Sequence, residues 1–149
     1  MRHKAHIGVD ADSGLAHSVI GTAANVSDVT QGHSLLHGQE TQVFADALYQ
    51  GAAARPEATG VDWQVTMKPG KRRALNTKTP LGAVLGQIEQ LKASVRAKVE
   101  HPFQVVKCQF GYVKVRLRGL AKNTAQLTTL FALGNLWMAR HQILRAAQG

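Results

Sequence analysis

One acidic side chain, Glu100, stands among cations in the stretch Arg96–Lys107. If this stretch is helical, Arg96 and Lys107 both lie within about 40° of Glu100 around the helix axis, at 100° per residue. One face would then present a carboxylate that can bind a metal ion, beside two cations that can bind phosphate. These groups are the ones needed to cut or join a nucleic-acid backbone.

The net charge of +9 is unevenly distributed along the chain. Residues 1–63 carry 3 Lys or Arg against 7 Asp or Glu, whereas residues 64–149 carry 15 against 2. Such an asymmetry indicates a polyanionic partner, most simply nucleic acid. The alternative is an ordinary, well-solvated basic surface.

Length and composition favour one globular domain. The chain has 149 residues, of which 44% are hydrophobic, so a real core is expected and disorder is not. Apolar runs of about 18 residues are absent, which predicts no membrane span. The start of the sequence has no signal-peptide hydrophobic region. Cys108 is the only cysteine, which excludes an internal disulfide and fits a cytoplasmic protein.

The first half of the sequence predicts a hairpin, a helix and two further short strands. Residues 6–10 and 15–20 read as the hairpin strands, joined by a turn in which Gly14 is free to adopt positive φ. Asn25 or Ser27 can cap a helix that would include Val29, Leu35 and Leu36. Residues 42–46 and 63–67 read as strands, and residues 68–73 form a basic turn.

The second half predicts two long helices separated by a strand. The first helix begins at about Pro80, and its apolar residues recur every three or four positions to form one stripe: Val84, Ile88, Leu91, Val95 and Val99. Pro102 could kink this helix and turn Lys107 away from Glu100. Residues 112–118 alternate apolar and basic residues, and residues 121–146 form the last helix.

Two further groups could carry chemistry or bind DNA. Asp46 closes a short apolar strand, which is where functional acids occur in mixed α/β folds, although such an Asp is often only a loop or capping residue. If residues 112–118 are extended, then Lys114, Arg116 and Arg118 lie on one face and could contact the DNA backbone.

The sequence resembles the carboxyl-terminal part of bacterial insertion-sequence DDE transposases of the insertion-sequence-five type, over nearly all of its length. In these enzymes the last acid lies in a signature of Tyr, two residues, Arg, three residues, Glu, six residues and Lys. Arg96, Glu100 and Lys107 match it, while Ala93 stands at the Tyr position. Other matching segments are residues 5–14, 22–28, 45–49, 95–103, 109–116, 119–125 and 133–138.

The resemblance implies an α/β fold like that of ribonuclease H, a mixed sheet flanked by helices. It assigns Asp46 and Glu100 as the second and third catalytic acids, which would hold Mg²⁺ for DNA cleavage and strand joining. Arg96 and Lys107 would contact phosphate. The expected partners are DNA at the element ends and a second transposase molecule, and the expected location is the bacterial nucleoid.

The first catalytic Asp of the family has no counterpart in the resemblance. It lies on a central strand before the segment that matches this chain's start, whereas Asp10 and Asp12 lie in the hairpin turn. We therefore expect residues 1–149 to form a truncated catalytic domain that is inactive alone. The alternative is a non-catalytic remnant that binds DNA or a partner and interferes with full-length transposase.

Overall fold

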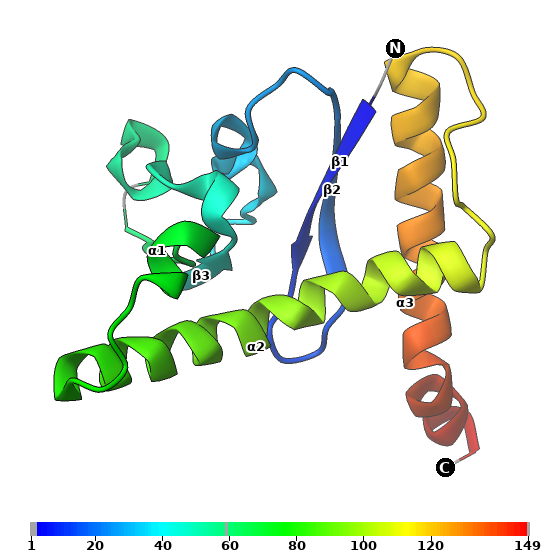
Figure 1. Ribbon diagram of the computed structural model, residues 1–149. Helices are drawn as coiled ribbons and strands as arrows, with labels where there is room; N and C mark the ends of the chain where they lie inside the picture. Colours follow the sequence, from blue (N-terminus) through cyan, green and yellow to red (C-terminus); the bar gives the residue numbers. More distant parts are fainter. Residues whose placement is uncertain (1–2, 59, 149) are drawn as a thin grey trace. The chain divides into compact units, whose positions relative to one another are not determined.

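A computed structural model of the chain describes residues 3–58 and 60–148 (Figure 1). Besides five short 3₁₀ helices, η1–η5, between residues 28 and 58, its elements are β1 (His3–Val9), β2 (Ala16–Ala23), β3 (Gln42–Ala45), β4 (Asp62–Val65), α1 (Pro69–Arg73), α2 (Pro80–Cys108) and α3 (Leu120–Gln148).

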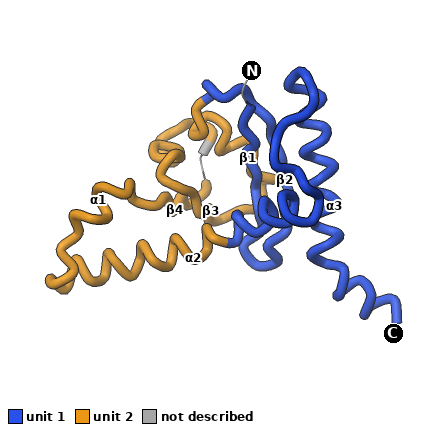
Figure 2. The backbone as a smooth tube through the Cα atoms, turned by 45° about the vertical axis from the view of Figure 1, so that its right-hand side comes forward, with its two compact units in different colours: residues 1–26, 98–149 blue, residues 27–97 orange. Residues whose placement is uncertain are grey.

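The chain divides into two compact units (Figure 2). Unit 1 consists of residues 1–26 and 98–149, and unit 2 of residues 27–97. Within the described residues the strands form two separate pairs, β1 with β2 and β3 with β4. The predicted α/β class is confirmed, with an antiparallel pair in unit 1 and a parallel pair in unit 2.

The predicted hairpin in unit 1 is confirmed. β1 and β2 pair antiparallel, with His6 opposite Ile20. Asp10 organises the turn, because its Oδ1 accepts hydrogen bonds from the backbone N–H groups of Asp12 (2.6 Å) and Ser13 (3.0 Å). Gly14 adopts a φ of 73°, which glycine tolerates at little cost. The role of the Asp10 carboxylate in this structure is therefore to stabilise the turn.

The core of unit 1 lies between the hairpin, the end of α2 and α3. Ile7, Val106, Leu127 and Phe131 are its buried members. The rings of Phe103 and Phe131 pack edge to face, with centroids 5.2 Å apart. Fully burying each such side chain stabilises a fold by about 1.5–3 kcal/mol. This core holds the last turns of α2 against the hairpin.

One polar residue of α3 and one glycine of β2 allow these two elements to pack closely. The side chain of Asn135 bonds both backbone groups of Ala16: its Oδ1 accepts from N–H (3.0 Å) and its Nδ2 donates to C=O (2.7 Å). Gly21 permits the close approach, since any side chain there would overlap Thr124. The helix that sequence periodicity predicts for residues 121–146 is confirmed and slightly longer, Leu120–Gln148.

Unit 2 is built around the parallel pair β3 and β4, in which Ala45 lies opposite Val65. The helix predicted after Ser27 is wrong: the chain forms two short 3₁₀ helices, η1 (Asp28–Gln31) and η2 (His33–Leu35). Ser27 precedes η1 but makes no side-chain capping bond. Gly32 separates the two and packs closely against the Trp63 ring, so packing overrides the local helical pattern.

α2 turns a different face inward than its hydrophobic pattern predicts. In unit 2 the apolar stripe is exposed, by 52% at Val84 and 67% at Leu91, although its spacing is typical of a helix face that packs on a core. Farther along the stripe, Val99 and Phe103 do pack on the core of unit 1. The helix continues past Pro102 to Cys108, so the proline does not end it.

One buried side chain of α2 in unit 2 belongs to an acid. Glu89 is only 2% exposed, and its Oε2 accepts a 2.7 Å hydrogen bond from the backbone N–H of Met67. Its Oε1 lies 3.3 Å from the ammonium of Lys92, which also donates to the carbonyl of Val65. Both contacts fasten α2 to the chain at the end of β4.

We expect Glu89→Ala to destabilise the chain by about 3–5 kcal/mol, because it leaves the Met67 N–H and the Lys92 ammonium without their buried partner. Urea unfolding followed by circular dichroism measures this. Glu89→Gln keeps an acceptor and should cost less. Gln90→Ala, at the next and exposed position, is the control and should change stability by less than about 0.5 kcal/mol.

The strand predicted for residues 112–118 is wrong. The segment is irregular and lies between Gly111 and Gly119, which adopt φ values of 63° and 90°. An alternating pattern needs a neighbouring strand to supply hydrogen bonds, and none pairs with it among the described residues. Instead, the Nδ2 of Asn123 donates to the carbonyls of Leu117 and Gly119.

Candidate metal and DNA site

Asp46 directly follows β3, as the sequence predicts. It caps the 3₁₀ helix η3 (Ala47–Tyr49): its Oδ1 accepts a 2.8 Å hydrogen bond from the backbone N–H of Leu48. The capping role and a metal-binding role are compatible, because a carboxylate has about four lone-pair sites and this bond occupies one. The bond also fixes the orientation of the carboxylate at the strand end.

Tyr49 reports on the charge around Asp46. Burial of its phenol raises its pKa from 10.0 to about 12, and the negative charges of Asp28 and Asp46 add to the shift. Unit 2 therefore brings two carboxylates near one tyrosine. The sequence reasoning did not propose Asp28 or Tyr49 as site residues, although both lie in segments that carry the family resemblance.

We expect the phenol of Tyr49 to titrate near pH 12 and Asp46→Asn to lower that pKa, because one negative charge is removed. The difference in phenolate absorbance between wild type and Tyr49→Phe isolates this residue. Since the folded-state pKa is raised, the stability from neutral Tyr49 is complete below about pH 10 and is lost as pH rises toward 12. Asp12→Asn, in the hairpin turn, should leave the titration unchanged.

A short chain of contacts within unit 2 connects the strand that bears Asp46 to α2. The N–H of Thr66 donates to the carbonyl of Ala45 (2.9 Å), next to Asp46. The following N–H, of Met67, donates to Glu89 on α2. On a regular helix, Arg96 lies within about 20° of the direction of Glu89. Within unit 2, Arg96 therefore lies on the face of α2 that contacts the end of β4.

Arg96 and Glu100 both lie on α2, and the helical premise of their predicted spacing is confirmed. Arg96 is half-buried, whereas Glu100 and Lys107 are exposed. Lys98, between them, donates to the carbonyl of Ala11 in the hairpin turn. Asp46 belongs to unit 2 and Glu100 to unit 1, so the convergence of their carboxylates stays a prediction.

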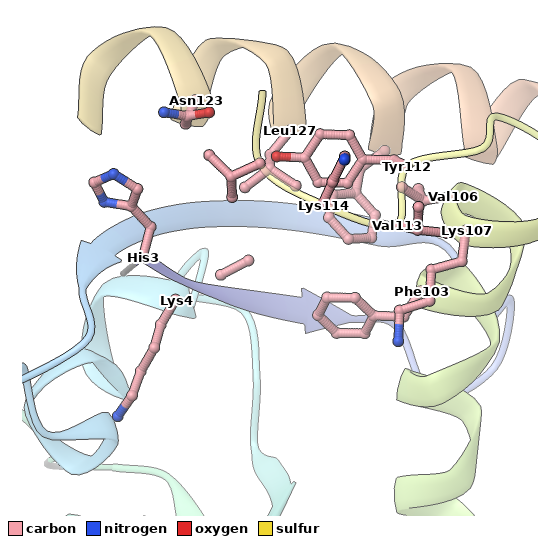
Figure 3. Close-up of a pocket in the computed structure, with 13 residues that line it drawn as sticks. His3, Lys4, Phe103, Val106, Lys107, Tyr112, Val113, Lys114, Asn123 and Leu127 are labelled. Carbon is pink, nitrogen blue, oxygen red and sulfur yellow. The ribbon is translucent and has the colours of Figure 1, made fainter. Parts of the chain in front are cut away.

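The predicted DNA-contacting cations after α2 are solvent-accessible. Lys114, Arg116 and Arg118 are exposed in the irregular segment before α3. Lys107 and Lys114 also border a cavity of about 210 Å³ in unit 1 (Figure 3). The cavity is otherwise largely apolar, and Asn123 and His3 lie at one end of it with Phe103 at the other.

Comparison with models of protein families shows the family of the chain. The model of the transposase DDE domain matches residues 2–136, so the chain belongs to the transposase DDE domain family. Membership indicates DNA transposition as the function and DNA as the substrate, in a family that normally uses divalent metal ions. The narrower insertion-sequence-five type stays a prediction.

No solved structure matches the chain. Among the described helices, none is both long enough and apolar enough to cross a membrane.

Proposed function

We propose that this chain contributes the second and third acids of a DDE transposase site, Asp46 and Glu100, which hold divalent metal ions, most simply Mg²⁺. The supporting observations are that Asp46 directly follows β3 and that Arg96 and Glu100 both lie on the helix α2 at the predicted spacing. Carboxylate oxygens are the ligands that Mg²⁺ prefers.

The side chains around these acids have distinct tasks in the proposed site. When bound, the metal ions supply activation of the attacking hydroxyl and stabilisation of the leaving oxygen. The planar guanidinium of Arg96 is suited to a bidentate contact with a phosphate. The ammonium of Lys107, about 20° from Glu100 around a regular helix, adds a point charge. Together they would hold the DNA backbone against the carboxylates.

The proposed metal site also requires the first catalytic acid of the family. The resemblance assigns only the second and third acids to this chain, and Asp10 is engaged in the hairpin turn. β1 pairs only with β2 among the described residues, so its other edge can accept a strand. We propose that the strand bearing the first acid adds there, and that the chain does not cleave DNA without it.

A double-mutant cycle on metal affinity tests whether Asp46 and Glu100 share one site. Mn²⁺, which takes similar oxygen ligands and is detected by electron paramagnetic resonance, is the probe. We expect Asp46→Asn and Glu100→Gln each to weaken binding, and the double variant to weaken it by less than the two effects combined. Independent, additive losses would place the acids in separate weak sites and contradict the proposal. Asp12→Asn is the matched control.

A second function is favoured by the exposed cations at residues 114–118, which need no metal ion to bind DNA. On this alternative the chain binds DNA or a transposase molecule without cutting, and so interferes with the full-length enzyme. Salt-sensitive retardation of DNA in a gel, without cleavage even when the first acid is supplied, would favour it.

A further inference from the structure

The three cations before α3 lie in a segment that is held mainly at its ends. We call residues 112–118 the cationic segment. Residues 113–118 are exposed, and in the described part of the chain residues 114–116 make no backbone hydrogen bond. At the first end, the N–H of Tyr112 donates to the carbonyl of Val106 on α2 (3.3 Å). A stretch without burial or hydrogen bonds of its own has little local stability, so its ends decide how its cations are presented.

One residue of α3 holds the other end of the cationic segment. Asn123 lies on α3 (Figure 3) and is only 1% exposed. Its Nδ2 donates to the carbonyls of Leu117 (2.8 Å) and Gly119 (2.6 Å). These two residues flank Arg118, so the amide of Asn123 fixes the backbone on both sides of that cation.

The chemistry of Asn123 suits this anchoring role better than core packing. Both of its partners are carbonyl oxygens, which only accept, so the amide NH₂ group must face them. The Oδ1 atom then has no hydrogen-bond partner among the described residues. A buried acceptor without a partner costs stability, and an apolar side chain would avoid that cost. What only the amide supplies is the pair of bonds to the backbone around Arg118.

Gly119 allows the same anchor to be disturbed in a second way. It adopts a φ of 90° directly before the first residue of α3, and a Cβ there would meet no atom within 4 Å. An added methyl group would therefore cause no clash, but it would strain the left-handed backbone that the anchor needs.

We propose that Asn123 is a positioning residue for DNA binding, which holds the cationic segment in the conformation that meets the phosphates. The inference rests on the proposed contact of these cations with DNA. A loop that is ordered before binding loses less conformational entropy on binding, and therefore binds more tightly. Asn123 itself is too deeply buried to contact DNA, so it acts through the segment.

A double-mutant cycle on DNA affinity tests the proposal, with the 149-residue chain and a fluorescent DNA duplex near 0.1 M salt. Asn123→Ala should weaken binding about tenfold. In a chain whose Lys114, Arg116 and Arg118 are all changed to Gln, Asn123→Ala should have no further effect, because the cations through which it acts are gone. An equal loss in both backgrounds, or no loss in either, would overturn the proposal.

Asn135→Ala is the matched control. Asn135 also lies on α3 and makes two hydrogen bonds to backbone, both to Ala16, at 3.0 and 2.7 Å. Its loss removes the same number of bonds from the same helix but should leave DNA affinity unchanged. Circular dichroism verifies that both variants fold. If Asn135→Ala weakens DNA binding as much as Asn123→Ala does, the effect is one of overall stability and the proposal is wrong.

Gly119→Ala repeats the test if Asn123→Ala does not fold. It should weaken DNA binding in the wild-type background and not in the triple Gln variant. Gly14→Ala is its control, because Gly14 also has positive φ and open space around it but lies in the hairpin turn. No loss from Gly119→Ala, or an equal loss from Gly14→Ala, would overturn the proposal. A triple Gln variant that binds DNA as well as wild type would instead refute the DNA contact of the segment, and the inference with it.

Discussion

Incubated alone with Mg²⁺, the 149-residue chain should leave DNA that carries the element ends uncut. Two carboxylates hold two metal ions poorly, and the lost stabilisation of the transition state, several kcal/mol, lowers the rate by about 10³-fold or more. Supplying the first acid, in a longer chain that includes its strand, should restore nicking. In that chain Asp46→Ala or Glu100→Gln should abolish it again.

The controls separate a failed site from a failed fold. Asp12→Ala removes an acid from the hairpin turn and should leave nicking by the longer chain unchanged. If the 149-residue chain itself nicks DNA, and Asp46→Ala stops it, then the proposed need for another acid is wrong. If the longer chain nicks DNA regardless of Asp46 and Glu100, then the assignment of these two acids is wrong.

Elements with local signals were predictable from the sequence. The hairpin depends on Asp10, whose carboxylate binds two backbone N–H groups, and on Gly14. The start of α2 depends on Pro80, because its fixed φ suits a first helical turn, and the Oγ1 of Thr79 binds the N–H of Gly82 there. Asp46 was found because a short apolar run ends at it, which the structure confirms as β3.

Features that depend on distant partners were not predictable. Val84 and Ile88 look like core residues from spacing alone, but unit 2 instead buries Glu89, whose partner Met67 is 22 residues away. The alternation of residues 112–118 predicts a strand only if another strand lies beside it. The periodic pattern of apolar residues indicates that a helix has an apolar and a polar face. Tertiary contacts decide which of these faces is buried.

Neutralising Lys114, Arg116 and Arg118 together as Gln should weaken DNA binding by about 10²–10³-fold near 0.1 M salt. All three are exposed, and Arg118 lies next to the first turn of α3, where the helix dipole disfavours a cation and favours a bound anion. If each contacts one phosphate, the slope of log affinity against log salt concentration should fall by about 2.7. Gel retardation across a salt series measures both quantities.

The matched control is the triple change of Lys71, Arg72 and Arg73 to Gln. It removes the same charge from an equally exposed segment, α1 in unit 2. Because DNA releases counterions only where a protein cation contacts a phosphate, this control should reduce affinity and slope much less. Equal losses from the two triples would mean that net charge alone governs binding, and the segment before α3 would then have no special role in contacting DNA.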